Sequence, residues 1–329
     1  MPNIYLNALR IALIALLASP IVPLGSLKAQ SYPVKPVRII SPFPPGGPTD
    51  ILGRLLAPAL ADSLGQPVIV ENRIGAGGTI GTDFVAKSPA DGHILLLGST
   101  GPLAIDVSLY RNLPYDPLRD LEPVIKLASV PMVLVIHPTV PAKTLDELIA
   151  ALKARPGGYS IASAGEGTPQ HLLGELLKSI TGVSMTSVPY RGSGPALVAV
   201  IAGQVPIMFD STVSVLPHIA AGRVHAVATT GHHRSHQLPD VPTMQESGMP
   251  GFEFEGWYGV LAPKGTPGPI IRKLNAVIAA ALDTPQLQER VRGLGSDVVH
   301  GSPDDFRVFV KIEIEKWGKV VEQSGVTSH

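Results

Sequence analysis

The sequence predicts an α/β fold in which two doubly wound lobes are joined by a two-stranded hinge. Two separate stretches of the chain alternate between strand-like and helix-like patterns, which is typical of parallel sheets wound by crossover helices. Glycine (34 residues) and proline (33) are plentiful whereas aromatic residues make up only 5%, a balance that favours many short elements joined by sharp turns. With 329 residues, 45% of them hydrophobic, the chain can supply a core for each of two lobes.

The first alternation starts at residue 37. Strands are expected at 37–41, 67–72 and 93–100, and helices at 49–64 and near 80–86. Thr49 or Asp50 is placed to cap the first of these helices. Pro58 lies inside that helix and removes one hydrogen bond at a cost of about 3 kcal/mol, so we expect a bend or a restart there.

The second alternation starts at Met132. Strands are expected at 132–138, 159–165, 186–190, 205–211 and 224–230, with helices at 145–154, 169–180, 195–202 and up to 221. Thr144 and Glu147 form a capping box, and Thr168 is a cap that is followed by a proline. Gly182 is placed as a helix stop.

The tail after Trp257 contains one strand-like segment and two amphipathic helices, which begin at 266–267 and 302–303. Because this tail has no sheet of its own, we expect it to complete the first lobe, with crossovers near 128–132 and 250–257. The predicted organisation is a signal peptide at 1–29, lobe 1 at 30–131 plus 255–329, and lobe 2 at 132–254. Lobes hinged in this way close on ligands.

The N-terminus is typical of an exported protein. Arg10 precedes the apolar run 11–18, which prolines and a glycine then interrupt, and we expect cleavage after Ala29. No later segment approaches the roughly 20 apolar residues of a membrane span, and the absence of cysteine excludes a lipid-anchored cysteine, disulfides and thiol catalysis. We therefore expect a soluble periplasmic protein.

Glycine-rich loops carry the candidate chemistry. Segments 41–50, 72–81 and 162–171 each follow a predicted strand and open a helix, and 188–196 repeats the pattern with Arg191 added. Bare backbone N–H groups and the positive end of a helix dipole make an anion site that needs no lysine or arginine. The spacing GxGxxxG departs from the dinucleotide fingerprint and no GK[ST] loop occurs, so an organic carboxylate is favoured over pyrophosphate and no cofactor is expected.

Other functions have weaker signals. Positive and negative side chains balance at 26 each, which argues against a nucleic-acid partner. No GxSxG motif occurs, so Ser99 and Ser163 are poor candidates for a catalytic serine. His232, His233 and His236 are expected in a solvated loop rather than at a metal. Three further side chains keep two interpretations each: His171 faces the crevice or the helix surface, Asp210 lines the cleft or caps the next helix, and Asp50 points to the N–H groups of its helix rather than to a ligand.

Longer motifs extend over nearly the whole mature chain: PFPPGGPTD, VENRIGAGGTIG, ASAGEGTPQHLLGELL, VPYRGSGPAL and LPDVPTMQESGMPGFEFEGWYGVLAPKGTP. In these motifs the stretch 37–326 resembles the Bug-type periplasmic receptors of tripartite tricarboxylate transporters. The resemblance implies a Venus-flytrap periplasmic-binding-protein fold whose loops hold a ligand carboxyl group through backbone N–H groups, hydroxyls and ordered waters. The chain departs from the family pattern at His93, where tyrosine is expected, and at Asp106 and Val107, where Asn-Pro is common.

The resemblance implies ligand contacts at Phe43, Gly46, Gly47 and Thr49 in one lobe and at Ser163, Gly165, Gly167, Thr168 and His171 in the other. The ends of neighbouring strands add Gly77, Gly78, Thr79, Ser99, Tyr190, Arg191 and Asp210 to the expected ligand-binding residues. The expected function is capture of a small carboxylate (a dicarboxylate, a tricarboxylate, an acidic amino acid or an aromatic acid) by a monomer that delivers it to membrane permease subunits. The alternatives are a receptor that presents its ligand to a membrane sensor kinase, and an exported hydrolase.

Overall fold

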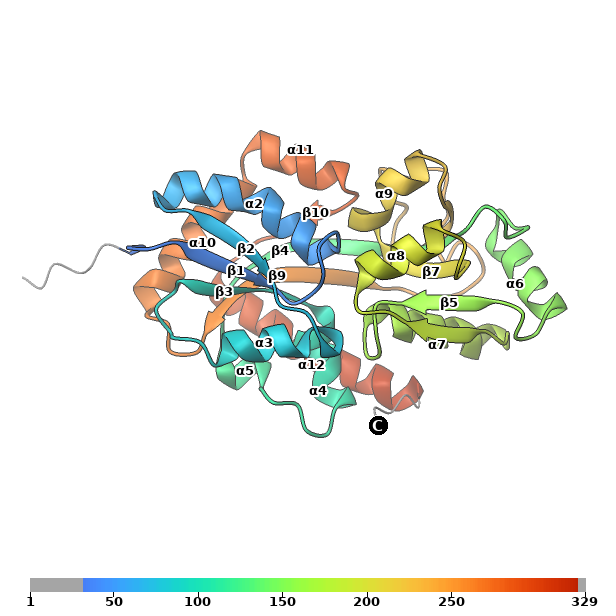
Figure 1. The fold of residues 1–329 in the computed structure, drawn as a ribbon, viewed down its shortest axis with the longest axis horizontal. Helices are drawn as coiled ribbons and strands as arrows, with labels where there is room; N and C mark the ends of the chain where they lie inside the picture. The colour runs from blue at the N-terminus through green and yellow to red at the C-terminus, as the bar shows by residue number, and fades with distance from the viewer. Residues whose placement is uncertain (1–31, 325–329) are drawn as a thin grey trace, which may run out of the picture. The chain divides into compact units, whose positions relative to one another are not determined.

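The computed structural model describes residues 32–324, and its strands form two connected sheets (Figure 1). The expected signal peptide and its cleavage site lie outside the described residues. In the first sheet, β1 (Val37–Ser41) pairs in parallel with β2 (Val68–Asn72) and β3 (Ile94–Ser99), and β9 (Glu255–Pro263) lies antiparallel between β3 and β4 (Leu121–Ile136). In the second sheet, β5 (Ser160–Ser163) pairs in parallel with β6 (Thr186–Pro189) and β7 (Ile207–Ser211), while β7 and β8 (His225–Thr229) pair antiparallel with β4.

Strand β4 belongs to both sheets. Its residues from Leu121 to Pro131 pair with β9, and those from Met132 to Ile136 pair with β7 and β8. The part of the chain built on β1, β2, β3, β9 and the beginning of β4 is called the first half below. The part built on the end of β4 with β5 to β8 is called the second half.

A second connection between the halves runs through Phe254, directly before β9, and a threonine ties it to β4. The fully buried Thr230 hydroxyl accepts a hydrogen bond from Met132 N–H (2.9 Å) and donates one to the carbonyl of Phe254 (2.6 Å). Backbone bonds from Thr230 N–H to Met132 and from Phe254 N–H to Thr230 complete the contact. The two segments that cross between the halves are therefore held in a fixed register.

Helices cover both faces of the sheets. The first half contains α2 (Pro48–Leu64), α3 (Thr79–Ala86), α4 (Asp106–Leu109), α5 (Pro117–Asp120), α10 (Gly268–Leu282), α11 (Pro285–Gly293) and α12 (Pro303–Ser324), with short turns at Ala76–Gly78 and Gly101–Ile105 and a short strand β10 (Asp297–Val298). The second half contains α6 (Leu145–Ala154), α7 (Pro169–Thr181), α8 (Ser193–Ile201) and α9 (Thr212–Ala220). Figure 1 shows α2 and α11 opposite α3 and α5 in the first half, and α8 and α9 opposite α7 in the second. Among residues 32–324, no helix combines the length and apolar character that crossing a membrane requires.

Most expected elements form close to their predicted bounds. The capping box of Thr144 and Glu147 starts α6, and α7 ends at Gly182 in the left-handed conformation. The expected cap of α2 is wrong: Gly47 is the N-cap, and Thr49 and Asp50 lie inside the first turn because Pro48 starts the helix.

Two further expectations need correction. Helix α2 does not restart at Pro58, which is exposed, so the carbonyl that it leaves without a helical partner can be hydrated. The strand expected from Met132 begins eleven residues earlier, at Leu121. Prolines and two register shifts interrupt the early part of β4, which hides its strand pattern in the sequence.

A buried carboxylate attaches α12 to the crossing strand β9. Glu313 accepts hydrogen bonds from the indole N–H groups of Trp257 (2.9 Å) and Trp317 (3.1 Å), and its side chain is only 7% exposed. Trp257 is also packed edge-on against Phe306 and Phe309 of the same helix, with ring centroids 5.7 and 5.3 Å apart. The aromatic residues of the tail therefore pack directly behind one of the two crossing segments.

Asp106 is a buried carboxyl group at the contact between the halves. It is 1% exposed, and it accepts a hydrogen bond from the Thr79 hydroxyl at 3.4 Å. A Cβ atom on Gly167 of the second half would come within 2.9 Å of Asp106 Oδ1. Burial raises the pKa of Asp106 to about 8, against a weaker lowering by the Thr79 hydrogen bond, so the group is mainly protonated at neutral pH.

Replacing Glu313 with alanine should lower the free energy of unfolding by about 3 kcal/mol, because two buried indole N–H groups would lose their acceptor. Glu313→Gln is the control, since its amide oxygen can still accept one of the two bonds, and it should cost less. Urea denaturation measures both. Equal stability of the wild type and Glu313→Ala would contradict this role.

Replacing Asp106 with asparagine should remove a pH dependence of stability. An unfolded aspartate ionises near pH 4, so between about pH 4 and 8 the folded protein binds a proton that the unfolded chain lacks. The free energy of unfolding of the wild type should therefore fall as pH rises through this window, by up to about 1.4 kcal/mol per pH unit. Thermal unfolding of Asp106→Asn should show a flatter profile and a higher Tm than the wild type at pH 8. Parallel profiles for the two proteins would refute this.

Candidate ligand-binding site

Two adjoining chambers open between the first and second halves. The inner chamber encloses about 470 Å3, part of it open to solvent, and the outer chamber about 1120 Å3 by the same measure. The inner chamber is lined by Phe43, Pro48, Thr49, Ser99, Thr100, Gly101, Gly256 and Tyr258 from the first half, and by Met132, Ala164, Thr168, Pro169, Gln170 and Ser193 from the second. Phe43 and Ala164 also line the outer chamber, so these two residues mark the passage between the chambers.

The inner chamber has a mostly apolar surface with several neutral polar groups, and none of the residues among 32–324 that line it is charged. Hydroxyl groups of threonine, serine and tyrosine and the amide of Gln170 provide its polar atoms, and Phe43 and Met132 provide apolar surface. In the outer chamber, Arg191 and Glu166 are the charged lining residues. An anion in the inner chamber would therefore be bound by neutral hydrogen-bond donors and helix dipoles.

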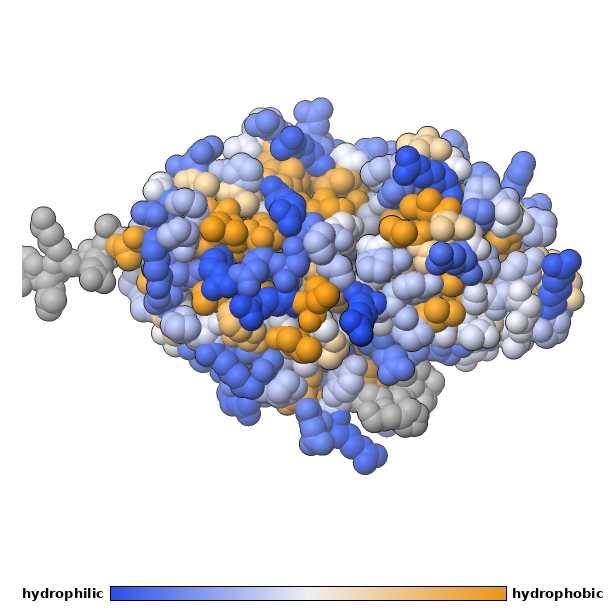
Figure 2. All heavy atoms as spheres, viewed as in Figure 1, coloured by the Kyte–Doolittle hydropathy of each residue, from blue (hydrophilic) through white to orange (hydrophobic). Residues whose placement is uncertain are grey.

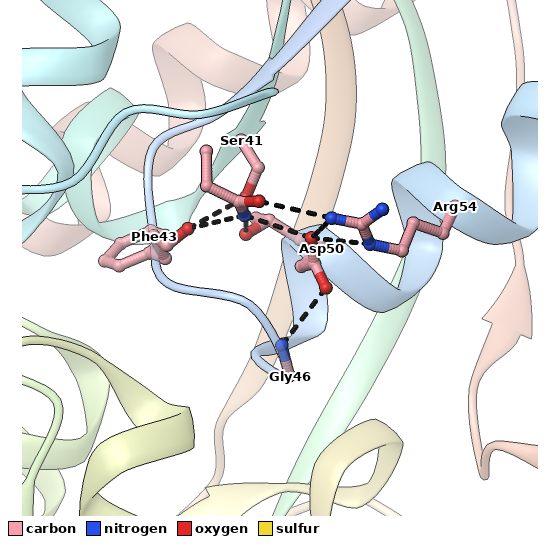
Figure 3. Close-up of polar contacts among 7 residues, drawn as sticks. Ser41, Phe43, Gly46, Asp50 and Arg54 are labelled. Carbon is pink, nitrogen blue, oxygen red and sulfur yellow. Dashed lines mark hydrogen bonds and ion pairs between the residues drawn. The ribbon is translucent and has the colours of Figure 1, made fainter. Parts of the chain in front are cut away.

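The loop between β1 and α2 is held in shape by Asp50 (Figure 3). The Asp50 carboxylate accepts hydrogen bonds from Gly46 N–H (3.1 Å), from Arg54 Nε (2.9 Å) and from Asn72 Nδ2 (3.0 Å). Asn72 also donates to the carbonyl of Phe43 at 2.9 Å. Burial by itself would raise the pKa of Asp50, but these hydrogen bonds outweigh it and hold the pKa below its ordinary value.

These contacts correct the expected role of two glycines. The N–H of Gly46 is engaged by Asp50, and the N–H of Gly47 donates to Pro44 O at 3.3 Å in a turn. Neither glycine lines a chamber, so both shape the loop rather than offer their N–H groups to a ligand. Pro48, the first residue of α2, has no N–H group. Within residues 32–324, Thr49 and Asp50 therefore provide the N–H groups at the start of α2 that make no helical hydrogen bond.

Helix α7 starts at the inner chamber from the opposite side. Thr168 and Pro169 line the chamber, and the first helical N–H bond is made by Leu172 to the carbonyl of Thr168. In the described part of the chain, the N–H groups of Gln170 and His171 therefore have no helical partner. The starts of α2 and α7 thus contribute to one chamber from the two halves.

His171 lies beside this site without lining it. Burial lowers the pKa of its imidazole, against the opposing effect of Glu175 and Glu166, so the ring is mainly neutral at pH 7. His171 Nδ1 and the hydroxyl of Ser163 are buried and have no hydrogen-bond partner among residues 32–324.

Asp210 lies behind the chamber wall instead of lining it. Its side chain is fully buried at the end of β7 and accepts hydrogen bonds from Ser193, Gln170 and the N–H of Ser211. Burial raises the pKa of Asp210 to about 6, and the hydrogen bonds from Ser193 and Ser211 limit that rise. The group is therefore mainly ionised at neutral pH.

Glycines bring the two halves close together around the chambers. A Cβ atom on Gly194 would lie 2.8 Å from the carbonyl oxygen of Pro45, and one on Gly192 would lie 2.5 Å from Pro44 Cδ. Gly192 also has φ +119°, which disfavours any residue with a side chain. The loop before α8 and the loop before α2 are therefore in backbone contact across the gap.

The structure distributes the expected ligand-binding residues over three places. Phe43, Thr49, Ser99 and Thr168 line the inner chamber, and Phe43, Gly77, Gly78, Gly165, Tyr190 and Arg191 line the outer chamber. Gly46, Gly47, Thr79, Ser163, Gly167, His171 and Asp210 line neither.

Sequence reasoning missed several inner-chamber residues, among them Thr100, Gln170, Ser193 and Tyr258. Gln170 and Ser193 lie within the glycine-rich segments and could have been found as polar residues at helix starts. Tyr258 belongs to a strand that returns from the tail, and no local pattern marks it. The histidines of the 232–236 loop are exposed, and His232 pairs with Glu253 at 3.2 Å. Among the described residues there is no group of three or more side chains suited to hold a metal.

The chain is similar over most of its length to known binding proteins. Residues 52–326 match the family model described as "Tripartite tricarboxylate transporter family receptor". Protein BugT of Bordetella pertussis is 46% identical over 300 residues, covering 91% of this chain and 92% of BugT. A relative from Agrobacterium vitis is 38% identical over 313 residues, covering 94% of this chain and 90% of the relative.

Solved structures show the same fold. The periplasmic binding protein BugD superposes with a TM-score of 0.88 at 39% identity, covering 91% of this chain and all of BugD. The R. palustris protein Rpa4515, solved with adipate, has a TM-score of 0.87 at 36% identity, covering 90% and 99% of the two chains. MatC from Rhodopseudomonas palustris, solved with bound malate, has a TM-score of 0.84 at 38% identity, covering 88% and 100%.

These similarities confirm the predicted family and the mixed α/β fold of a periplasmic binding protein. The match runs through both halves and includes the start of α7 at the inner chamber, whereas the start of α2 lies just before the matched residues. The members of this receptor family are periplasmic solute-binding proteins and not enzymes. The chain therefore belongs to the receptor family of tripartite tricarboxylate transporters.

Proposed function

We propose that this protein captures a small organic carboxylate in the inner chamber and delivers it to the membrane permease subunits of a tripartite tricarboxylate transporter. The observation that carries the proposal is the pair of helix starts, at Thr49 and Gln170, whose unpaired N–H groups belong to one chamber without a charged wall. Relatives at 36% and 38% identity have been solved with adipate and with malate, both carboxylates.

The ligand-binding residues in this proposal come from both halves. Phe43, Thr49, Ser99 and Thr168 contact the solute, with Gln170, Ser193 and Tyr258 added from the chamber wall. Arg191 in the outer chamber is placed to attract a second acidic group of a longer solute. Export through a signal peptide at residues 1–29 and action as a monomer are parts of the same proposal.

Opening and closing of two lobes gives the solute access to the chamber. We take the lobes as residues 30–131 with 255–329 and residues 132–254, which meet where β4 exchanges β9 for β7 and β8. The contact of Thr230 with Met132 and Phe254 at the crossing segments gives the hinge a fixed pivot. Figure 2 shows apolar patches on the surface near α3 and α8. Ile74 before α3, Ile80 in α3 and Val198 in α8 are exposed.

Thermal-shift measurements against a panel of mono-, di- and tricarboxylates test the proposal. A ligand at about 100 times its Kd adds about 2.7 kcal/mol to the free energy of unfolding, which is readily seen as a rise in Tm. At least one carboxylate should raise the Tm, and sugars and amines without a carboxyl group should not. Failure of every carboxylate in the panel would overturn the proposed function.

Blocking the close approach of the lobes should weaken binding without unfolding either lobe. Gly194→Val places a branched side chain against the carbonyl of Pro45, and we expect the affinity for the best carboxylate of the panel to fall at least about tenfold. Gly293→Val is the matched control, because a Cβ atom there meets nothing within 4 Å. Calorimetric titration should give wild-type affinity for the control. Unchanged affinity of Gly194→Val would argue against closure as part of binding.

A further inference from the structure

The side chain of Asp210 is surrounded by hydrogen-bond donors. Ser193 Oγ lies 2.7 and 2.6 Å from its two carboxylate oxygens, Ser211 N lies 2.8 Å from Oδ1, and Gln170 Nε2 lies 3.3 Å from Oδ1. No lysine, arginine or histidine among residues 32–324 forms an ion pair with it. Burial, and after it the charge of Asp210, raises the pKa of Tyr258, which lies on β9 and is separated from β7 by β4. Two of the donors, Ser193 and Gln170, also line the inner chamber.

The carboxylate fixes the direction of both wall groups. A serine hydroxyl has a single hydrogen, and the two short contacts direct the hydrogen of Ser193 to Asp210. An ionised carboxylate can only accept, so the amide of Gln170 must turn its nitrogen toward Asp210 and its oxygen away from it. Ser193 Oγ and Gln170 Oε1 are therefore left as hydrogen-bond acceptors for whatever occupies the chamber.

Thr168 adds a third acceptor to the same wall. Its hydroxyl donates to the carbonyl of Gly165 at 2.6 Å, which leaves only lone pairs for the chamber. Thr100 on the opposite wall has the reverse arrangement. Its hydroxyl oxygen accepts a hydrogen bond from the backbone N–H of Trp257 at 3.0 Å, so its hydroxyl hydrogen is left to donate. The side chains of the second half thus offer acceptors, whereas Thr100 and the N–H groups of α2 in the first half offer donors.

We propose, building on the proposed function, that the solute is a carboxylate that also carries a hydroxyl or ammonium group, and that Asp210 is a positioning residue that holds Ser193 and Gln170 as acceptors for this group. A carboxylate group alone can only accept hydrogen bonds. The side-chain oxygens of Ser193, Gln170 and Thr168 would then face carboxylate oxygens and would have no donor to pair with. Sites built to pair with a hydroxyl or amine discriminate strongly against the analogue that lacks it, because their own polar groups then stay unpaired.

Matched series of acids test the class of solute. Calorimetric titration compares propionate with lactate and alanine, succinate with malate and aspartate, and adipate with 2-hydroxyadipate and 2-aminoadipate. In at least one series the hydroxy or amino acid should bind roughly tenfold or more tightly than the unsubstituted acid. The hydroxy and amino members of each series separate the two kinds of donor.

Variants test the role of Asp210. In Asp210→Asn the new amide can donate to Ser193, whose hydrogen can then turn into the chamber, so the preference for the substituted acid should shrink to about twofold or less while binding of the unsubstituted acid persists. Ser193→Ala removes one acceptor from the chamber wall and one donor from Asp210 while keeping the carboxylate itself. It should reduce the preference in the same direction, so it decides the matter where Asp210→Asn does not fold. Asp106→Asn is the matched control, since it makes the same change at a buried carboxyl group that does not line the chamber. In this variant the ratio of the affinities for the substituted and the unsubstituted acid should equal that of the wild type.

The outcomes separate this inference from the proposed function. Equal binding of substituted and unsubstituted acids by the wild type would overturn the inference and leave the proposed function standing. Equal weakening of both classes of acid in Asp210→Asn and Ser193→Ala, with an unchanged ratio, would reduce Asp210 to a structural role. Binding of no acid in any series, nor in the wider carboxylate panel, would remove the proposed function itself.

Discussion

The change of partners along β4 is the constraint on which the rest of the structure depends. One unbroken strand pairs with β9 up to Pro131 and with β7 and β8 from Met132 onward, so two sheets share a single backbone. Because Thr230 bonds both to Met132 and to Phe254, the returning chain must cross at the same point. The ends of β1, β3 and β5 then come together on either side of this crossing, and the inner chamber lies among the loops that follow them.

An anion in a chamber that no charged side chain lines requires donors that carry no full charge. The loop before α2 shows how such donors are kept available: Asp50 takes up Gly46 N–H and is itself neutralised by Arg54. The pair leaves no excess charge at the helix start, so the N–H groups of the first turn keep their partial positive charge.

The sequence was sufficient for most helices, because their signals are local. The capping box at Thr144 and the glycine stop at Gly182 each depend on residues within a few positions of the helix end. The early part of β4 could not be predicted, since its prolines and register shifts are compensated only by pairing with β9, more than 120 residues away. For the site, the glycine-rich loops located the chamber, but the tyrosine in its wall and the carboxylate behind Ser193 depend on long-range packing.

One part of the contact between the halves pairs glycines with prolines. Gly192 and Gly194 meet Pro44 and Pro45, so this part of the contact fixes almost no rotatable side-chain bonds. Little side-chain entropy is therefore lost where these two loops meet. Substitutions in the chamber wall can therefore change the accepted solute while the closing surface stays the same, a separation that allows one scaffold to serve many different cargoes.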